Sequence, residues 1–440
     1  GRQQASDATS FLISMAEGKQ IQSKAKELRP LQAFAMLLLG FNNLATGWQA
    51  TGLGRNSRHI GNTLSSVPRS LMSEGSSSVA LFVGLNPALQ RRVELEKLAV
   101  GSVNRAGSSS TGIGGKGQGS FMASLQLTAA EASNGISGFP APQLCMFLGA
   151  GQEGDALGEL LKRKIGVPDS DGLWTRVASS CRICTTLVES GTGDATEIVE
   201  PSGKVSDDEW EKLLQSLRTL FSSEKAKALA ICGTAPPGVP QDAYSQIIQL
   251  VCGPETLVVV DSVVDVRATL EAAAKMTGCS GRVMVKLNAR EILKLAGQEV
   301  TGSDSQVPVD PAKVAGAFGE FTSSATGTAD YVCFTDGPFP GGVINVQSGR
   351  RWKLERKGSL RAPIVSPIGA GDATTAGTLH AWCRAPSEAA KALGSADDHA
   401  VQAFRFGLAV GAASCLTGDN AVFNMDDVTD IYETIEISEV

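Results

Sequence analysis

Short apolar runs separated by helix-like segments are the feature that most limits the folds open to this sequence. Each run is almost continuously apolar and contains β-branched residues, which is typical of strands in a parallel sheet covered on both faces. The runs that we interpret as strands are residues 79–85, 144–148, 228–232, 257–260, 283–287 and 331–335.

Segments of helical character lie between these runs. Parallel strands need a long crossover connection, and a helix usually supplies it. The expected helices are residues 154–164, 206–222, 241–252, 266–275 and 289–296. The alternation therefore predicts an α/β fold with a doubly wound, mostly parallel sheet and helices on both faces.

One region lacks the intervening helices. Residues 173–177, 181–189 and 195–200 are strand-like runs separated only by brief polar or glycine turns. With residues 90–103, they predict a small antiparallel sheet whose strands lie within about 88–105 and 172–201. Such a sheet can act as a lid over a site at the carboxyl edge of the main sheet. Nearer the C-terminus, a hairpin is expected from residues 342–346 and 351–355.

The first 75 residues differ in composition from the rest. They contain eight Lys and Arg against four Asp and Glu, a local charge of +4 in a chain whose net charge is −6. The apolar segment at 31–41 is expected to be helical, and it is shorter than the about 20 residues that a membrane-spanning helix requires. We interpret 1–75 as an extension and 76–440 as the folded domain. The extension is either a tether, such as the remnant of a processed leader, or an arm that docks on a protein partner.

Composition argues against several classes of function. The net charge of −6 gives no general attraction for nucleic acid. Only three histidines occur, widely spaced, which disfavours a His-based nucleophile triad or a zinc site. The nine cysteines have no regular framework, which favours reduced thiols. We expect a protein of the cytoplasm or another reducing compartment, such as a plastid stroma if a leader was removed, with neither membrane nor nucleic acid as a partner.

The most specific motif is Pro-Ile-Gly-Ala-Gly-Asp at 367–372, followed by small residues that predict a helix. Gly369, Ala370 and Gly371 can turn sharply, so that their amides form an anion hole at the helix N-terminus. Asp372 would then lie in the first turn, where a carboxylate can take a proton from an attacking hydroxyl during phosphate transfer. The alternative is that Asp372 only caps its helix.

Two weaker motifs also suit phosphate chemistry. The sequence GIGGKGQG at 112–119 opens a helix with close backbone approach and one positive charge, although it is not a Walker P-loop. Asn288 and Glu291 begin a helix directly after an expected strand. There they can organise Mg²⁺ and water around phosphates, or they can simply form an N-cap with its Glu partner.

The order of these motifs resembles the ribokinase-like PfkB carbohydrate kinases, nearest to the 1-phosphofructokinase and tagatose-6-phosphate kinase branch. The resemblance spans residues 79–425 and implies the ribokinase-like fold. It rests on NPAL at 86–89, GGKG at 114–117, TEIVEP at 196–201, GTAPPG at 233–238, KLNAREI at 286–292, TDGPFPGG at 335–342 and PIGAGD at 367–372.

The resemblance implies an ATP-dependent kinase that transfers the γ-phosphate to a hydroxyl of a sugar or sugar phosphate. Asp372 would be the general base and 369–371 the anion hole, while Asn288 and Glu291 would organise Mg²⁺ and phosphates, Glu291 acting on the metal indirectly. The residues implied around the nucleotide are Thr335, Gly337, Gly342 and, in the segment over adenine, Cys415. The residues implied at the acceptor are Gln90, Gly114, Gly115 and Lys116.

Arg182 is a further candidate at the acceptor. It lies in the expected lid, from which its guanidinium could reach a substrate phosphate. The alternative is that it stays in water, as Arg on an edge strand commonly does. Because lid strands in the family often pair between subunits, the resemblance also implies a homodimer through the lid.

Two of the positions that depart from the family pattern lie on the acceptor side, and a smaller departure is Leu287, where the family usually has Pro. NPAL is usually followed by Asp, where this chain has Gln90, and GGKG by one residue and then Asn, where it has Gly119. An amide can still bond a hydroxyl, but glycine offers no side chain. The departures indicate either a changed acceptor, such as a nucleoside, or a catalytically weak scaffold subunit that acts through residues 1–75.

Overall fold

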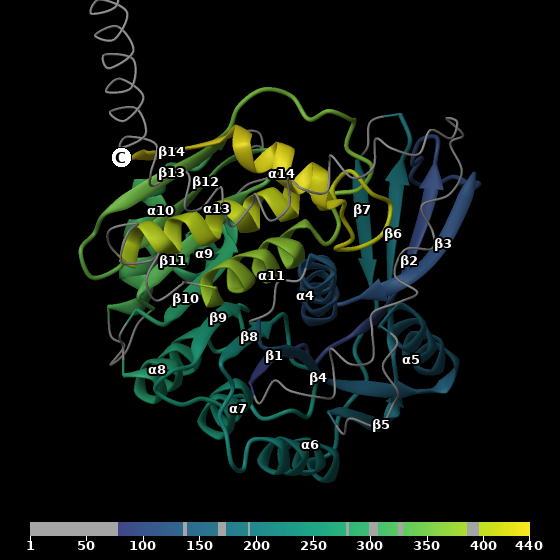
Figure 1. Ribbon diagram of the computed structural model, residues 1–440. Coiled ribbons are helices and arrows are strands. Elements are labelled where there is room, and N and C mark those ends of the chain that lie inside the picture. The colour runs from purple at the N-terminus through teal and green to yellow at the C-terminus, as the bar shows by residue number, and fades with distance from the viewer. Residues whose placement is uncertain are drawn as a thin grey trace, which may run out of the picture.

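A sheet of ten strands lies at the centre of the described protein, with helices on both of its faces (Figure 1). The computed structural model describes residues 78–134, 139–165, 173–191, 194–278, 281–298, 307–323, 329–384 and 396–440. The extension expected at 1–75 lies outside these residues. The expected fold class, an α/β fold with a mostly parallel sheet, is confirmed.

The strand order across the main sheet is β14-β13-β12-β11-β10-β9-β8-β1-β4-β5. All six strands expected from the apolar runs are among its parallel strands, which are β1 (Val79–Val83), β4 (Ala141–Ala150), β5 (Trp174–Ser180), β8 (Ala228–Cys232), β9 (Leu257–Asp261), β10 (Val283–Asn288) and β11 (Tyr331–Asp336). Three antiparallel strands continue the sheet and include the expected hairpin: β12 (Phe339–Asn345), β13 (Arg351–Arg356) and β14 (Ile435–Glu439).

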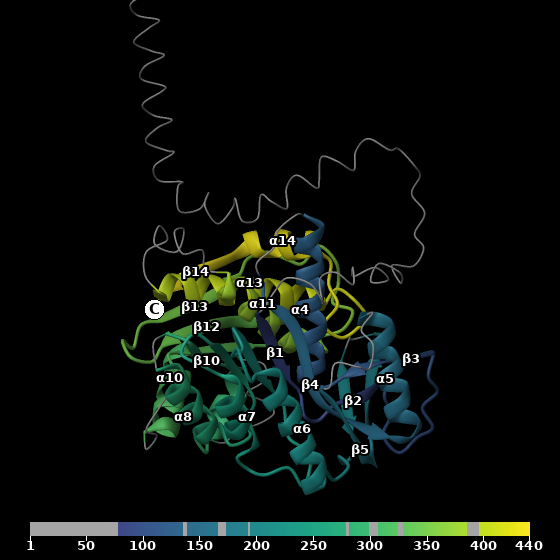
Figure 2. The ribbon, with the colours of Figure 1, turned by 60° about the horizontal axis from the view of Figure 1, so that its bottom comes forward.

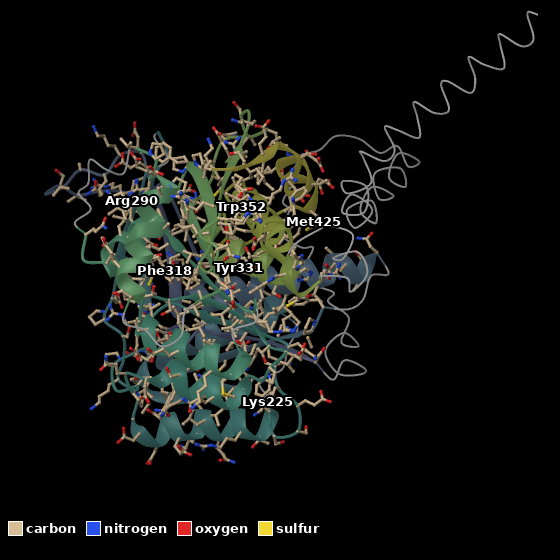
Figure 3. All side chains as sticks on the ribbon, turned by 90° about the vertical axis from the view of Figure 1, so that its left-hand side faces the viewer. Lys225, Arg290, Phe318, Tyr331, Trp352 and Met425 are labelled. Carbon is tan, nitrogen blue, oxygen red and sulfur yellow. The ribbon has the colours of Figure 1, made fainter. Side chains whose placement is uncertain are left out.

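Both faces of the sheet are buried because successive side chains of a strand point to opposite sides. In β1, Phe82 belongs to one buried apolar cluster and its neighbour Leu81 to another. Trp352 belongs to the cluster of Phe82 and Phe318 to the cluster of Leu81 (Figure 3). Burial on both sides is the physical reason why these strands appear in the sequence as unbroken apolar runs.

A layer of helices covers each face of the sheet (Figure 2). The layer on the Phe82 side consists of α4 (Lys116–Ser133), α11 (Ala370–Cys383), α13 (Ala396–Ser414) and α14 (Met425–Thr434). The opposite layer consists of α6 (Asp207–Leu220), α7 (Ala243–Val251), α8 (Val266–Thr277), α9 (Ala289–Leu295) and α10 (Pro311–Thr322). The five expected helices correspond to α6, α7, α8, α9 and α5 (Gly151–Ile165), which packs on β4.

Glycines allow the helices beside α11 to approach it closely. An ideal Cβ atom built on Gly377 of α11 would lie 3.0 Å from the Cα of Gly407 on α13, and one built on Gly411 would lie 2.7 Å from the α11 backbone. On the other side, a Cβ atom at Gly119 of α4 would lie 2.3 Å from the carboxylate oxygen Oδ2 of Asp372. Helix α11 is therefore flanked by glycine on both sides.

A second, smaller sheet stands beside the main one, with the order β3-β2-β6-β7 (Figure 1). Its strands are β2 (Ala88–Leu95), β3 (Ser108–Gly114), β6 (Arg182–Glu189) and β7 (Ala195–Val199). The pair β2 and β6 is parallel and the other two pairs are antiparallel, so the small sheet is mixed rather than purely antiparallel. Strand β2 follows β1 and β6 follows β5, and both therefore leave the same edge of a parallel sheet in the same direction.

Two details of this lid sheet differ from the sequence prediction. The run at 173–177 was expected in the lid, but it forms most of β5, which pairs with β4 at the edge of the main sheet. Strand β3 was not expected, because its sequence SSSTGIG shows no apolar alternation. The partner of a strand is set by tertiary packing, so a local pattern could not assign β5 to either sheet.

Two further expectations concern the chain as a whole. Among the residues that the structure describes, no helix is both long and apolar enough to cross a membrane. The cysteines in this part of the chain are free thiols, as the sequence indicated.

Candidate active site

The turn that precedes α11 is shaped for an anion. Gly369 is the N-cap residue, and its φ of 81° lies in the left-handed region that favours glycine. The Ala370 amide donates to the Pro367 carbonyl at 3.3 Å, whereas the amides of Gly371 and Asp372 belong to the first turn and have no acceptor within the helix. The amides of Gly371 and Asp372 are thus available at this helix N-terminus, and the anion hole expected at 369–371 stays a prediction.

The Asp372 carboxylate does not cap its helix. Gly369 holds the N-cap position, and no side chain makes a capping hydrogen bond there. The carboxylate lies instead against α4, where an ideal Cβ atom at Gly119 would be 2.3 Å from Oδ2 and 2.8 Å from the Cβ of Asp372. Rotating the carboxylate would leave the second clash in place. Gly119 thus allows α4 to approach Asp372.

A buried carboxylate, Asp261 at the end of β9, anchors the first turn of α11. Lys286 of β10, whose side chain is 3% exposed, donates to Asp261 Oδ2 at 3.1 Å and to the Gly371 carbonyl at 2.8 Å. Lys116 donates to Asp261 Oδ1 at 3.0 Å, and the Thr375 hydroxyl donates to Oδ2 at 2.6 Å. This ion network ties the carboxyl ends of two strands to the start of one helix.

The same charges set the proton affinities of the two acids. Burial and the negative charge of Asp261 raise the pKa of Asp372 to about 8, although Lys116 and Lys286 oppose this shift. Burial also acts against ionisation of Asp261, but Lys116, Lys286 and the Thr375 hydroxyl lower its pKa to about 2. One acid of the pair is therefore ionised at neutral pH, while the other binds a proton near neutrality, a separation common at catalytic sites.

Asn288 and Glu291 form a capping box at the start of α9. The Glu291 amide donates to Asn288 Oδ1 at 2.8 Å, and the Asn288 amide donates to Glu291 Oε2 at 2.9 Å. The capping interpretation is therefore correct. The other oxygen, Glu291 Oε1, lies 3.4 Å from Lys116 Nζ, so Glu291 also faces the ion network.

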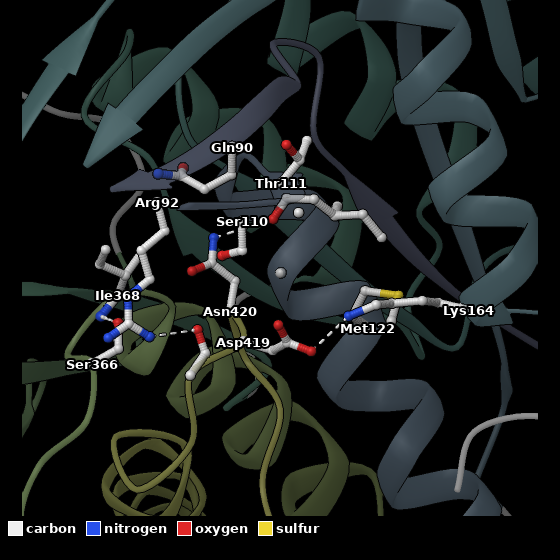
Figure 4. A pocket seen from close by; sticks show the side chains of 14 residues that line it. Gln90, Arg92, Ser110, Thr111, Met122, Lys164, Ser366, Ile368, Asp419 and Asn420 are labelled. Carbon is white, nitrogen blue, oxygen red and sulfur yellow. Dashed lines mark hydrogen bonds and ion pairs between the residues drawn. The ribbon is translucent and has the colours of Figure 1, made fainter. Parts of the chain in front are cut away.

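A pocket lies between the lid sheet, α4 and residues 418–420 of the loop after α13 (Figure 4). Gln90 of β2 and Gly119 of α4 are both in its walls. Gln90 is buried and donates from Nε2 to the Thr186 hydroxyl at 2.7 Å. It lies over Gly114, where an ideal Cβ atom would be 3.1 Å from Gln90 Oε1. The two acceptor-side positions that depart from the family pattern thus meet in one pocket, which adjoins Asp372 through Gly119.

Four residues implied at the acceptor are not in the described walls of this pocket: Gly114, Gly115, Lys116 and Arg182. Lys116 is bonded within the ion network. Gly115 is the N-cap of α4 with a φ of 105°, and an ideal Cβ atom there would lie 3.2 Å from the Cα of Pro87. Arg182 donates from Nη2 to the Asn86 carbonyl at 2.8 Å. Its guanidinium is thus held by backbone at the base of the lid.

The residues implied around the nucleotide lie in several places. Thr335 pairs with Asn288 at the carboxyl ends of β11 and β10, and Gly337 follows in a turn with a φ of 60°. Cys415 comes directly after α13, and burial raises the pKa of its thiol to about 11. Gly342 lies inside β12, where an ideal Cβ atom would be 2.4 Å from a phenylalanine ring of β11. The glycine at 342 is therefore explained by packing within the sheet.

A comparison with protein families identifies the chain. The model of the pfkB family carbohydrate kinases matches residues 88–423. The chain belongs to this family. It is a phosphotransferase with an alcohol group as acceptor, as the resemblance of its motifs implied.

Solved structures with this fold include other sugar kinases. A tetrameric inhibited form of phosphofructokinase-2 from Escherichia coli is 22% identical, with a TM-score of 0.57 over 81% of this chain and 98% of that chain. A Thermotoga maritima protein described as a possible 1-phosphofructokinase is 19% identical, with a TM-score of 0.59 over 82% and 99%. A ribokinase from Giardia lamblia is 14% identical, with a TM-score of 0.60 over 81% and 98%. At these identities the likeness establishes the ribokinase-like fold.

PfkB kinases use ATP with a divalent cation. Within the described ranges, no group of three or more His, Cys, Asp and Glu side chains could hold a metal ion by itself. Mg²⁺ in general keeps several waters and is bound chiefly through substrate phosphates and one or two carboxylates. The exposed part of Glu291, beside Lys116, is a suitable partner for such waters.

Sequence reasoning misses three residues of this kinase's ion network: Asp261, Lys286 and Thr375. Two of them carry a signal that could have been used. Asp261 ends the apolar run LVVVD and Lys286 interrupts the run VMVKLN, and a charge within a buried strand requires a partner. Thr375 carries no such signal, because hydroxyl side chains are common in helices that pack closely.

Proposed function

We propose that this kinase transfers the γ-phosphate of ATP to a hydroxyl of a sugar or sugar phosphate, as the resemblance to 1-phosphofructokinases suggests. One observation carries the proposal. Asp372 lies in the first turn of α11 with the amides that can bind a phosphate, and it touches Gly119, which lines the acceptor pocket. The carboxylate is therefore at the boundary between the donor and acceptor sides.

Bound Mg-ATP would supply the phosphoryl group. Asp372 accepts the proton of the acceptor hydroxyl as that oxygen forms its bond to the γ-phosphorus, while the bond from that phosphorus to the bridging oxygen breaks and ADP leaves. The amides of Gly371 and Asp372 donate to the transferring group, and the ammonium groups of Lys116 and Lys286 offset its negative charge. A base whose pKa is about 8 binds the released proton strongly at neutral pH.

On the nucleotide side, we assign Asn288 and Glu291 to the Mg²⁺ and phosphate region, with Glu291 acting through water. Support comes from the position of Glu291 Oε1, 3.4 Å from Lys116 Nζ. Thr335 and Gly337 would border the nucleotide at the neighbouring strand end, and Cys415 would lie near the adenine. Gly342 would shape this side only through the packing of β12.

On the acceptor side, we assign Gln90, with Gly114 beneath it, to contacts with sugar hydroxyls. The buried amide of Gln90 is in the pocket wall and keeps its Oε1 oxygen for an acceptor hydroxyl to donate to. Gly115 would form the N-cap of α4, and the ammonium group of Lys116 would offset the negative charge of the phosphate. Arg182 would act as a support for the segment at 86–87, to whose carbonyls it donates.

The test is an acceptor screen with the purified full-length protein and Mg-ATP. Sugars, sugar phosphates and nucleosides are supplied separately, and the phosphorylated product is detected by ³¹P NMR together with the ADP formed. We expect transfer to a sugar or sugar phosphate. Transfer only to nucleosides, or no product from any acceptor, would overturn the proposal.

We also propose that two copies of the kinase pair through their lid sheets. Strand β7 is an edge strand with all five residues exposed, and Ile198 and Val199 remain 54% and 52% exposed. An apolar unpaired edge is a site for pairing with another chain. Light scattering should give a dimer that becomes a monomer in Ile198→Lys, while Glu197→Lys on the same strand serves as a charge control. A monomeric wild-type protein would contradict the pairing.

A further inference from the structure

We infer that Arg92 is a positioning residue that holds the lid sheet against the two segments that shape the anion hole, an inference that rests on the proposed kinase function. Arg92 lies on β2, next to the pocket residue Gln90 but two positions further from the main sheet. It is part of neither the ion network nor the phosphate-binding turn. Its guanidinium instead crosses from the lid to the C-terminal part of the chain.

The contacts of Arg92 join three parts of the chain. Nη1 donates to the Gly418 carbonyl at 3.0 Å (Figure 4), and Nη2 donates to the Val365 carbonyl at 3.1 Å. Nη2 also lies 3.0 Å from a carboxylate oxygen of Glu94 on the same strand. The side chain is only 12% exposed, so these charged hydrogen bonds form largely out of water. The planar guanidinium donates to two carbonyls at once, a geometry that the ammonium group of Lys cannot reproduce.

Both carbonyl partners belong to segments that lead to the anion hole. Val365 and Ser366 donate their amides to the Cys415 carbonyl at 2.8 and 3.2 Å, so the segment before the PIGAGD motif is fastened to the end of α13. Gly369 is pressed against the loop that follows Gly418. An ideal Cβ atom on Gly369 would lie 2.5 Å from the amide nitrogen of Ala421.

The loop at 418–421 is held in a strained conformation. Ala421 has a φ of 53°, in the left-handed region that residues with a side chain rarely adopt. Such strain persists only where the surroundings impose it, and it is concentrated at functional sites. The Ala421 carbonyl accepts from Gln126 Nε2 at 2.9 Å, and Asn420 Nδ2 donates to the Ile113 carbonyl of β3 at 3.1 Å. The loop is therefore tied to the lid by a second link.

These two links both lie at the walls of the acceptor pocket. Arg92, Ile113, Gly418 and Asn420 are all in its walls. Opening the lid to admit an acceptor must break the links to the loop, and the loop in turn holds Gly369 at the start of α11. Closure of the lid and formation of the anion hole are thus one coupled change, which would limit loss of phosphate to water before an acceptor is enclosed.

Hydrogen exchange tests the link without any acceptor. In full-length Arg92→Met, amides in 365–373 and 415–423 should exchange about tenfold faster than in the wild type, the lower end of the effect expected for losing hydrogen bonds to a charged group. The matched control is Arg91→Met, because Arg91 is the exposed neighbour on the same strand. Equal exchange in the two variants would overturn the inference, even if no kinase activity is found.

Kinetics with the acceptor found in the screen test the coupling. Arg92→Met should lower kcat for transfer about tenfold and raise the ratio of ATP hydrolysed to acceptor phosphorylated, while the KM for ATP stays near the wild-type value. Arg92→Lys should recover only part of kcat, and Arg91→Met should match the wild type. If Arg92→Met changes the acceptor KM alone, with an unchanged hydrolysis ratio, Arg92 is a binding residue and the coupling is disproved.

Discussion

The donor and acceptor sides that we propose for this site are built in different ways. On the donor side, Asp261 and two lysines join strands β9 and β10 to helix α11 through buried, charged bonds. On the acceptor side, the pocket walls come partly from the lid, and Gln90 and Gly119 contribute a neutral amide and no side chain. Two of these charged groups, Asp261 and Lys286, stand on the central sheet, whereas the recognition groups stand partly on a separate small sheet.

This difference separates two demands on the enzyme. Stabilising charge during phosphate transfer needs groups fixed in advance, which rigid strand ends provide. Accepting a new alcohol needs only changes in the shape and hydrogen bonding of one wall. We therefore expect substitutions on the donor side to reduce the rate with every acceptor, and substitutions in the lid to act on particular acceptors.

The largest effect is expected at the boundary between the two sides. Asp372→Asn removes the proton acceptor with little change in shape, and it should lower kcat by a factor of about 10² to 10⁴. Because the folded-state pKa of Asp372 is raised, the unfolded chain releases this proton at lower pH than the folded protein, and the free energy of unfolding falls as pH rises from the ordinary Asp pKa to about 8. The Asn variant should thus be no less resistant to urea at pH 7 than the wild type. A full rate in this variant would show that Asp372 is not the base.

The second prediction concerns the rigidity of the donor side. Lys286→Met leaves Asp261 buried with one cation fewer and should lower the free energy of unfolding by about 3 kcal/mol. Lys116→Met removes the other cation, whose side chain is 37% exposed, and should cost about 1 kcal/mol. Urea denaturation measures both. Equal losses of unfolding free energy in the two variants would mean that the difference in burial does not affect the strength of the two ion pairs.

Gly119 offers a sharper comparison, because the family pattern places Asn at this position. Introducing Asn at position 119 should lower both stability and activity, because even its Cβ atom would lie 2.8 Å from the Cβ of Asp372. We expect Gly119→Ala to lower the free energy of unfolding by about 2 kcal/mol and Gly119→Asn to lower it further, with kcat falling in both. Gly112→Ala is the control, because Gly112 lines the same pocket and a Cβ atom there has no neighbour within 4 Å. A gain in activity in Gly119→Asn would show that Gly119 only lacks the acceptor contact that Asn makes at this position in the family.

The smallest expected change, taken per pH unit, is that of the pH dependence. For the free enzyme, kcat/KM should rise tenfold per pH unit and level off near pH 8, because Asp372 must lose its proton before it can accept another. This rise of kcat/KM with pH should be absent in Asp372→Asn. A plateau that begins near pH 4 would mean that the carboxylate is solvated like an ordinary Asp and that the ion network does not act on it.

The sequence predicted the parts of this molecule that depend on local pattern. Strand β8 has the bounds expected from its apolar run, and the capping box at Asn288 was among the stated alternatives. The mixed pairing of the lid and the position of β5 could not be predicted, because they depend on which strand ends meet in space. For the same reason the sequence identified Asp372 through its glycine turn and missed its partner Asp261, which lies at the end of a separate strand.

The glycines that flank α11 restrict how this enzyme can change over evolutionary time. At Gly119 on one side and at Gly407 and Gly411 on the other, any single substitution adds atoms where the neighbouring helix already stands. A lineage could leave these residues only by several simultaneous changes, each harmful alone. Mutational paths to a new acceptor are therefore open mainly through the lid, and variation among descendants of this protein should accumulate there while α11 and its neighbours stay constant.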